Sequence, residues 1–528
     1  MAATEKRWLL IFATILLSVT TLPYLIGFWQ NGNSWQFSGF FMGVEDGNSY
    51  IAKMLLGSEG EWLFKTPYTA FPQNGFLAFL PYLLLGKLAS PPGQHAQLTA
   101  LFQLFRWAGG FVMVYATYLF VSYFIEDLFL RKLGTIVAVI GGGLGWLSLF
   151  GLQWLWGGRI PLEYYSPETF GFLSLLTLPH LAMARGLLLL GILMYWKGFR
   201  SKTSYKKMLL NGMLWVALGL MQPLTVAVGW MVIGLDIILR LFRGKFSSFS
   251  GFIREPGVIN GLVMGLCSAP ILFYTIISFN VDPFLKIWSA QNIISSPPPG
   301  DYLLGYAVLL PFLFIGARKI FLERRIEALV TIVWVVLIPV LAYFPYNLQR
   351  RLPEGTWVAI VIAALIGLNS LKPNLKMKGS WLLALSLITP IIIFAGSILA
   401  VTQTREPLFQ PADAVNAFTF LGDRVTKYPV VLAAYEPSNS LAAWAPVRTV
   451  IGHGPESVHL DEVKVQVADF FNPELSDDKR MMIIEQYSIK YILWGPAERQ
   501  LGSWKPADWS KVTKIYQNTT EQIFEVNQ

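Results

Sequence analysis

Charged residues are scarce in this sequence. Asp, Glu, Lys and Arg make up 14% of its 528 residues, whereas soluble domains carry about 25%. Cysteine is scarcer still, because Cys267 is the only one. A framework of disulfides within the chain and a cysteine-based metal site are therefore excluded, and a single large soluble core is not expected.

Long hydrophobic runs account for the shortage of charge. Residues 8–28, 134–150, 258–278, 326–343 and 380–401 are each long enough, or nearly so, to cross roughly 30 Å of hydrocarbon as a helix. The first run follows a short basic start but lacks a small-residue cleavage site, so it is expected to remain as a first span. The predicted fold class is a polytopic α-helical membrane protein with about 11 to 13 transmembrane helices.

The positive charges indicate how the chain crosses the membrane. Residues 1–400 hold 29 Lys and Arg against 16 Asp and Glu, a net charge of +13, whereas residues 401–528 hold 12 against 16, a net charge of −4. Basic clusters in short loops mark the cytoplasmic side, so this excess reports orientation rather than nucleic-acid binding. The clusters are Lys6-Arg7, 197–207, 240–254, 317–325 and 371–378.

A hairpin of two helices hinged at Gln222-Pro223 is expected, because proline breaks the helical hydrogen-bond ladder. With this hairpin, the basic clusters from 197–207 onward all fall on the cytoplasmic side. Residues 401–528 are then expected outside the cell. The N-terminal third of the chain fits this alternation across the membrane less well. Apolar segments near 76–89, 98–125, 134–150 and 178–196 give the wrong parity if each crosses once, so we expect one to be split or re-entrant, or a further span within 160–178.

Residues 401–528 differ in character from the rest of the chain. Short β-type runs are predicted at 428–435, 447–452, 489–495, 512–517 and 522–526, and helices at 413–425, 460–471 and 476–487. The expected domains are a membrane domain, 1–400, with a first outer loop at about 29–75, and a small extracytoplasmic α/β domain, 401–528. Residues 452–462 contain two histidines and three acidic residues, but their spacing matches no strong metal-ligand motif, so a turn and a capped helix are expected there.

An acidic pair, Glu45-Asp46, lies in the first outer loop. The following stretch SYIAKMLL, 49–56, has an amphipathic pattern suited to a membrane surface. The pair could simply be solvated, or could cap a helix that starts near Gly47. Acidic residues held against apolar and aromatic surroundings are also candidates for a raised pKa and for general-base catalysis.

The order of these features resembles the GT-C superfamily of membrane glycosyltransferases. A first span is followed by an acidic pair on a membrane-surface helix and then by a Gly-, Pro- and Asn-containing re-entry, PYTAFPQNG. The superfamily includes protein O-mannosyltransferases, aminoarabinose transferases and oligosaccharyltransferases. The C-terminal segments PADAVNAFTFLGDRV, RTVIGHGPES and YSIKYILWGPAER are similar to the outer domains of many bacterial proteins of this kind.

The resemblance implies an inverting glycosyltransferase that uses a sugar donor on polyprenyl phosphate and a lipid, glycan or protein acceptor at the outer face. It implies a catalytic carboxylate in the first outer loop, here Asp46 with Glu45 beside it. Many members have Asp-Asp or Asp-Glu at this place, so Glu-Asp leaves open which acid is the base. The implied location is a bacterial or archaeal cell membrane, with membrane lipids and no nucleic acid as partners.

Two adjacent arginines, Arg350 and Arg351, lie in a loop that we place outside, where the positive-inside tendency disfavours them. They could pair with lipid head groups or anchor a helix end. In the resembling enzymes, basic residues of later outer loops bind the donor, and bidentate guanidinium geometry suits a phosphate. Tyr346 and Gln349 could assist in this role.

A further set of ionisable residues, Glu163, Glu168, His180 and Arg185, lies in the mostly apolar stretch 157–186. Such groups at membrane depth tend to be functional or paired. The plain alternative is that His180 is hydrogen-bonded within the bundle while Arg185 reaches an interface. The resembling enzymes often carry a second acidic motif here, which makes Glu163 and Glu168 candidates for substrate or divalent-metal (Mg or Mn) binding. They do not form a DxD motif, so metal dependence stays open.

Two other functions are weighed against the enzyme. One is a lipid or polysaccharide transporter or flippase, and the other is a non-catalytic envelope assembly protein. Transporters commonly show paired half-repeats and midplane charges, whereas this sequence has no internal repeat and its unusual charges lie in loops placed outside. These features favour the glycosyltransferase.

Overall fold

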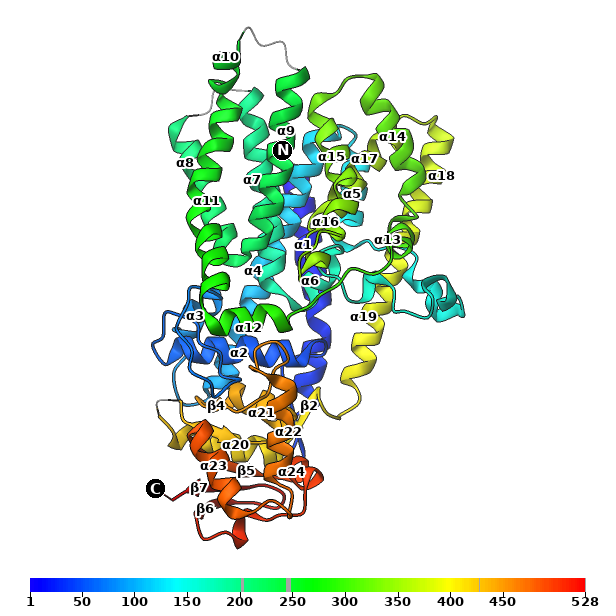
Figure 1. Ribbon diagram of the computed structural model, residues 1–528. Coiled ribbons are helices and arrows are strands. Elements are labelled where there is room, and N and C mark those ends of the chain that lie inside the picture. Colours follow the sequence, from blue (N-terminus) through cyan, green and yellow to red (C-terminus); the bar gives the residue numbers. More distant parts are fainter. Residues whose placement is uncertain (201–203, 244–247, 427, 528) are drawn as a thin grey trace. The chain divides into compact units, whose positions relative to one another are not determined.

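The computed structural model describes residues 1–200, 204–243, 248–426 and 428–527 (Figure 1). The predicted basic clusters 197–207 and 240–254 therefore lie partly outside the described residues. The chain forms two compact units. Unit 1 consists of Met1–Thr21, Phe105–Ile276 and Ile294–Gly396, and unit 2 consists of Leu22–Leu104, Ile277–Ile293 and Ser397–Gln528.

Helices make up nearly all of unit 1. Those that lie within it are α5 (Leu128–Ile140), α6 (Gly171–Thr177), α7 (Pro179–Arg200), α8 (Tyr205–Met221), α9 (Pro223–Arg243), α10 (Phe249–Ile253), α13 (Pro299–Tyr306), α14 (Leu310–Leu322), α15 (Ile326–Val336), α16 (Ile338–Ala342), α17 (Thr356–Asn369) and α18 (Pro373–Ala384). Short 3-10 helices cover Gly145–Phe150, Gln153–Trp156, Leu162–Tyr164, Gln349–Arg351 and Leu385–Leu387. The boundary between the units falls inside α1 (Ala3–Trp29), α4 (Gln94–Phe124), α11 (Pro256–Val281) and α19 (Ile388–Val401).

The polytopic helical class is confirmed. Among the described residues, 7 helices are long and apolar enough to cross a membrane, or 8 if the bent pair of α13 and α14 counts as one span. They cover Ala3–Trp29, Gln94–Phe124, Pro179–Arg200, Pro223–Phe242, Pro256–Val281, Gln349–Asn369 and Pro373–Val401. This number is below the predicted 11 to 13, because other apolar helices are short: α5 has 13 residues and α8 has 17.

Two of the four apolar segments predicted in the N-terminal third, 76–89 and 134–150, are not continuous long helices. The predicted segment 76–89 contains only the seven-residue α3 (Leu80–Gly86), which packs against α2 (Val44–Ser58) inside unit 2. A Cβ atom on Gly86 would lie 1.7 Å from the Met54 carbonyl oxygen, so this close packing requires glycine. The expected span at 134–150 is interrupted, since α5 ends at Ile140. The hairpin is confirmed, because α8 ends at Met221 and α9 begins at Pro223.

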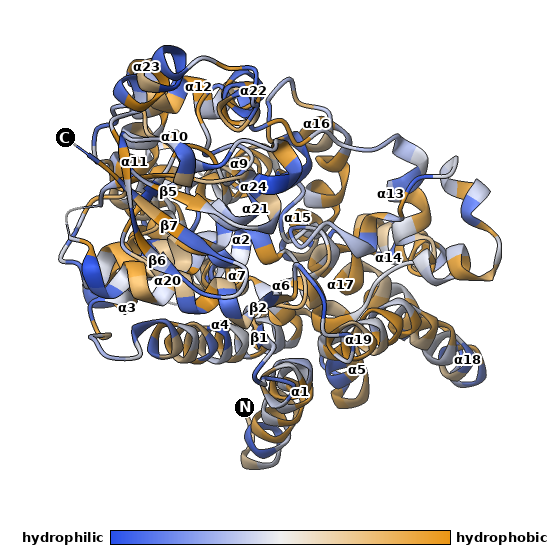
Figure 2. Ribbon diagram, turned by 90° about the horizontal axis from the view of Figure 1, so that it is seen from below, coloured by the Kyte–Doolittle hydropathy of each residue, from blue (hydrophilic) through white to orange (hydrophobic). Residues whose placement is uncertain are grey.

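The core of unit 1 is built around α17. Its residues from Thr356 to Leu368 are all buried, and Figure 2 shows predominantly hydrophobic colour on this helix and on α5. A helix that is apolar all round belongs inside a bundle. α14 packs closely on α17 because Gly316 and Gly367 leave no room for a Cβ: one there would lie 1.9 Å from the Ala363 oxygen and 2.1 Å from the Phe312 oxygen, respectively.

Unit 2 contains a mixed five-stranded sheet in the order β4-β3-β5-β7-β6. The strands are β3 (Val430–Leu432), β4 (Arg448–Thr449), β5 (Ile489–Trp494), β6 (Val512–Gln517) and β7 (Gln522–Val526). β3 runs parallel to β4 and β5, and β7 runs antiparallel to β5 and β6. Each strand falls inside a β-type run predicted from the sequence, so the small α/β region is confirmed.

Helices cover both faces of this sheet. They are α20 (Ala412–Arg424), α21 (Tyr435–Trp444), α22 (Leu460–Phe470), α23 (Asp477–Tyr487) and the short α24 (Pro496–Leu501), with a 3-10 helix at Pro506–Asp508. Successive strand residues face opposite ways. Val430 and Leu432 pack in the cluster that contains α22 and α23, whereas Val431 packs in the cluster that contains α20 and α21.

The first loop belongs to the same unit as the sheet. Its strand β1 (Trp35–Phe37) pairs antiparallel with β2 (Phe409–Pro411), which follows the last span. α2 then packs against α3 and against α21, and α12 (Pro283–Gln291) contributes Phe284, Leu285 and Trp288 to a cluster that includes Leu56. Three segments far apart in the sequence thus build one unit around α2.

Candidate functional site

The acidic pair of the first loop stands in the first turn of α2. The helix begins at Val44, directly after Gly43, whose φ of 59° and ψ of 47° are left-handed. Gly43 is the N-cap residue and makes no side-chain cap hydrogen bond, so the alternative that Glu45 or Asp46 caps a helix starting near Gly47 is wrong. Both carboxylates are stabilised there by the positive end of the helix dipole.

Glu45 holds the loop to the C-terminal part of unit 2. Its Oε1 atom accepts a hydrogen bond from the Tyr435 hydroxyl at 2.8 Å and another from the Gly454 backbone N–H at 2.7 Å. The Asn439 amide donates to the Glu45 backbone oxygen at 3.3 Å. Burial, together with the hydrogen bond to Glu45, raises the pKa of Tyr435, so the phenol remains a donor at neutral pH. Glu45 is therefore occupied by structural contacts.

Asp46, the second acid, is also exposed but faces a different partner. Its side chain is 61% exposed, and its Oδ1 atom lies 3.3 Å from Nε2 of His453, whose side chain is only 8% exposed. Burial alone would lower the pKa of His453, but the Glu456 carboxylate and the hydrogen bond with Asp46 outweigh it, and the pKa lies above its ordinary value. The pair thus combines an exposed carboxylate with a buried imidazole.

A buried ion pair lies close to His453. The Lys53 ammonium lies 2.7 Å from Oε1 of Glu456, and the two side chains are 1% and 3% exposed. Glu456 also accepts hydrogen bonds from Ser49 at 3.0 Å and from Thr66 at 2.6 Å. Burial alone would raise the pKa of Glu456, but Lys53 and His453 bring it below its ordinary value.

This burial corrects the expectation for the stretch 49–56. The predicted helix is present, but Ile51, Met54 and Leu55 are buried within the protein, and Lys53 turns inward. The amphipathic pattern is therefore satisfied by packing on α3 and α21. A lysine on an inward face requires a carboxylate partner, which Glu456 supplies from the C-terminal part of the chain.

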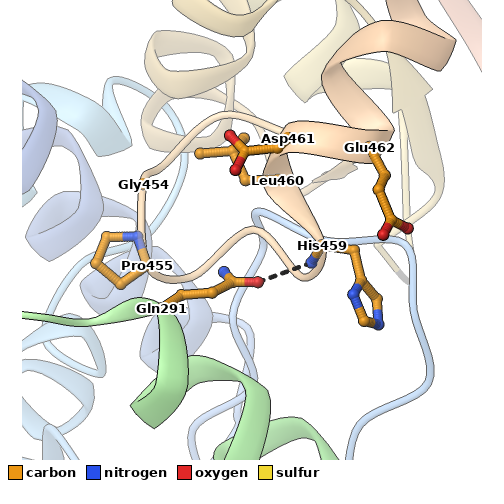
Figure 3. A pocket seen from close by; sticks show the side chains of 7 residues that line it. All are labelled: Gln291, Gly454, Pro455, His459, Leu460, Asp461 and Glu462. Atoms are coloured by element: carbon orange, nitrogen blue, oxygen red, sulfur yellow. Dashed lines mark hydrogen bonds between the residues drawn. The ribbon is translucent and has the colours of Figure 1, made fainter.

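A pocket of about 450 Å³ opens beside the loop that carries His453. It is lined by Gln291, Gly454, Pro455, His459, Leu460, Asp461 and Glu462 (Figure 3). The Gln291 side chain crosses from α12 and braces the loop: its oxygen accepts from the His459 N–H at 2.9 Å, and its amide donates to the Ser457 carbonyl at 2.8 Å. The predicted turn and helix are present, but the predicted cap is not: His459 is the N-cap residue of α22 and no side chain caps it.

The arginine pair predicted to bind phosphate lies in unit 1, in the 3-10 helix Gln349–Arg351. Nε of Arg351 is 3.3 Å from a Glu168 carboxylate oxygen, and the Arg351 side chain is 34% exposed. The Arg350 guanidinium lies over the Tyr165 ring, 4.7 Å from its centroid. The structure therefore brings together Arg351 and Glu168, two residues singled out separately in the sequence.

A second ion pair lies next to this one. The Arg185 guanidinium is 2.6 Å from a Glu354 carboxylate oxygen, and both side chains are buried. Arg185 also donates to the backbone carbonyls of Pro167 and Glu168, so it holds the segment that presents the Glu168 carboxylate. Arg185 does not reach outward to an interface, because Glu354 neutralises it within the protein.

The remaining predicted site residues of unit 1 are Glu163, His180, Tyr346 and Gln349. Glu163 is buried and accepts from the Gly145 N–H at 2.8 Å. His180 is half-buried in the first turn of α7. Tyr346 is 44% exposed. The Gln349 amide, oriented so that its nitrogen meets acceptors, donates to the carbonyls of Phe344 and Ala342 at 3.2 and 3.3 Å.

Metal ligands do not gather in either unit as the structure describes it. No group of three or more His, Cys, Asp or Glu side chains that could hold a metal ion occurs among the described residues. Glu163 and Glu168, proposed as metal ligands from the resemblance, make the separate contacts given above. Their surroundings do not fit a divalent metal site built by this chain alone.

Two important residues of unit 2, Lys53 and Tyr435, were not singled out in the sequence, and His453 was considered only as a metal ligand within 452–462, where the spacing matches no strong motif. Lys53 carried a usable signal, since a lysine between Ala52 and Met54 on an apolar helix face points to a buried charge. His453 and Tyr435 carried none, because only the fold brings residues about 400 positions apart to the start of α2.

Comparison with known proteins agrees with the fold. No family model matches this chain, and no curated protein matches it. Among solved structures, the oligosaccharyltransferase AglB of Archaeoglobus fulgidus, in complex with an inhibitory peptide and a dolichol-phosphate, is 13% identical with a TM-score of 0.52, and the match covers 93% of this chain and 70% of that one.

Two further solved structures are similar over nearly the whole chain. ArnT of Cupriavidus metallidurans bound to undecaprenyl phosphate is 12% identical with a TM-score of 0.53, and the match covers 99% of this chain and 98% of that one. The mycobacterial arabinofuranosyltransferase AftD is 13% identical with a TM-score of 0.54, over 99% of this chain and 40% of that one. The predicted resemblance to the GT-C fold is thereby confirmed at the level of the fold.

Proposed function

We propose that this protein is a membrane glycosyltransferase that moves a sugar from a polyprenyl-phosphate donor to a lipid, glycan or protein acceptor. The observation that carries the proposal is the exposed Asp46 carboxylate, set at the start of α2 against the buried His453 in a chain with the GT-C fold. The solved relatives AglB and ArnT hold dolichol-phosphate and undecaprenyl phosphate, which supports a lipid-phosphate donor for this chain as well.

In this proposal Asp46 is the general base. An acceptor hydroxyl gives its proton to the Asp46 carboxylate while its oxygen forms a bond to the anomeric carbon of the sugar. The bond from that carbon to the phosphate oxygen breaks, and its electron pair leaves with the polyprenyl phosphate, which inverts the configuration. General-base catalysis of this kind contributes about 10²–10⁴-fold to the rate. Glu45 is not assigned this task, because its carboxylate already accepts from Tyr435 and Gly454.

Donor binding is proposed for the arginine pair in unit 1. Arg351 has one carboxylate partner, Glu168, and a partly exposed guanidinium, so it retains N–H donors for a phosphate oxygen. Arg350 is fixed over Tyr165, which pre-orients its planar group. Guanidinium groups suit phosphate because they offer paired donors in one plane.

The orientation is also part of the proposal. Residues 401–528 are expected on the extracytoplasmic side as a domain distinct from the membrane domain 1–400, because their acidic balance and the basic loops before them follow the positive-inside rule. The expected setting remains a bacterial or archaeal cell membrane. A transporter or flippase and an envelope assembly protein stay as alternatives, and neither requires a base at Asp46.

The test compares Asp46→Asn with Glu45→Gln. Lipids and surface glycans of cells with and without the gene are first compared by mass spectrometry, which identifies the product that needs this protein. Asp46→Asn is nearly isosteric, so the protein should insert normally while product formation falls by about 10²–10⁴-fold. Glu45→Gln should lose less, because the amide oxygen can still accept from Tyr435 and Gly454. Wild-type product levels in both variants, at matched membrane abundance, would refute the catalytic assignment.

A further inference from the structure

His453 occupies an unusual position for a buried histidine. The side chain is buried and its ring stacks on Tyr68, with the ring centroids 5.5 Å apart. Nε2 faces Asp46, whereas Nδ1 is buried and has no hydrogen-bond partner among the described residues. Leaving a buried polar atom unpaired costs stability, so this histidine is not explained by packing alone.

The loop that carries His453 is held rigidly. The Ser457 hydroxyl accepts from the backbone N–H groups of Gly452 and His453, each at 3.1 Å. Gln291 fixes the other end of the loop through Ser457 and His459, as Figure 3 shows for the bond to His459. The imidazole therefore reaches Asp46 from a fixed backbone.

We propose that His453 is the positioning residue for the Asp46 carboxylate: its Nε2–H donates to Oδ1 of Asp46 and fixes the orientation in which this carboxylate receives the proton of the acceptor hydroxyl. This inference rests on the proposed function and adds a residue from the other end of the chain to the site. Two facts support it together. The donor is buried and preorganised, and the carboxylate that it meets is exposed to an incoming acceptor.

Charge around the ring is consistent with a donating imidazole. The titratable and charged groups that face it are Asp46 and Lys53 from α2, Glu456 from its own loop, and Tyr68 and Tyr435 from the segments packed against it. Glu456 favours the protonated imidazole and Lys53 opposes it. Both the protonated imidazole and the neutral Nε2–H tautomer can donate to the Asp46 carboxylate across this contact.

The first test needs no substrate. The chain has 4 histidines, so the full-length protein labelled with ¹⁵N-histidine in nanodiscs gives few imidazole signals, and His453→Gln assigns the one of interest. Replacing Asp46 by Asn removes the negative partner, so the pKa of His453 should fall by about one pH unit, the low end of the effect of a close opposite charge because Asp46 is exposed. Glu45→Gln is the matched control and should leave it in place. An unchanged pKa in Asp46→Asn overturns the proposal.

The second test uses two amides at one position. In His453→Gln the side-chain NH₂ group reaches about as far as Nε2 did, whereas in His453→Asn it reaches only about as far as Nδ1. Both are neutral and polar, so a structural role would be disturbed by both alike. Product levels in complemented cells should fall by about 10–100-fold in His453→Asn, the range for a lost hydrogen bond to a charged group, and His453→Gln should recover most of the loss.

The outcomes separate the two proposals. Equal activity of His453→Asn and His453→Gln overturns the positioning role. If Asp46→Asn abolishes the product while His453→Asn behaves as wild type, the role of His453 fails and the proposed function stands. If Asp46→Asn makes normal product, the proposed function fails, and the titration of His453 alone decides whether the contact exists.

Discussion

The buried pair of Lys53 and Glu456 gives the sharpest prediction about stability. Glu456→Gln keeps the shape of the side chain and an oxygen that can accept from Ser49 and Thr66, but it removes the negative charge. Lys53 would then be an unpaired ammonium in a site where the two side chains are 1% and 3% exposed. Breaking a buried pair by removing one partner costs about 3–5 kcal/mol.

That loss should be visible in thermal unfolding. A change of 1 kcal/mol shifts Tm by about 2–4 °C in domains of roughly 150–250 residues, so Glu456→Gln should lower the Tm of the detergent-purified protein by about 6–20 °C. The 19 tryptophans provide the fluorescence signal. Glu485→Gln, an exposed carboxylate on α23, is the control and should change Tm little.

A double variant separates the charge from the packing. Lys53→Met combined with Glu456→Gln leaves no unpaired charge, so it should recover most of the loss, as replacement of whole buried ion pairs does elsewhere. The reasoning about a buried ion pair is refuted if Glu456→Gln has the same Tm as the Glu485→Gln control. It is also refuted if the double variant has the lowest Tm of the set.

The same pair predicts how stability depends on pH. The pKa of Glu456 lies below its ordinary value of 4.5 in the folded protein, so the unfolded chain binds this proton more readily. Its contribution is fully present above the ordinary value and is lost as the pH falls through the folded-state pKa. Between about pH 5 and pH 3, the Tm of the wild type should therefore fall more steeply than that of Glu456→Gln.

Two further predictions concern the donor and the topology. Arg351→Ala should weaken binding of undecaprenyl phosphate by about 10–100-fold and Arg351→Lys by less, measured by scintillation proximity with labelled lipid; unchanged affinity in both would leave Arg351 as a partner of Glu168 only. Asp478→Cys in a Cys267→Ser background should react with a membrane-impermeant maleimide in intact cells or spheroplasts, and labelling only after lysis would contradict the extracytoplasmic position of residues 401–528.

The sequence alone determined the class of the protein and many of its elements. Apolar length indicates where helices can cross a membrane, and short β-type runs predict the strands from β3 to β7. Proline marked the break at Gln222, because it cannot donate the helical hydrogen bond. These features depend on neighbours in the chain, so a local pattern suffices to predict them.

Only the tertiary structure decided the surroundings of the acidic pair. The amphipathic pattern of 49–56 does not tell whether its apolar side meets lipid or protein, and the buried Lys53 resolves this in favour of protein because Glu456 neutralises it. Glu45 and Asp46 are adjacent and chemically alike in the sequence, yet one is taken up by Tyr435 and Gly454 and the other faces His453. These partners are about 400 residues away, and contacts of that range follow from the packing of whole elements, which no local pattern encodes.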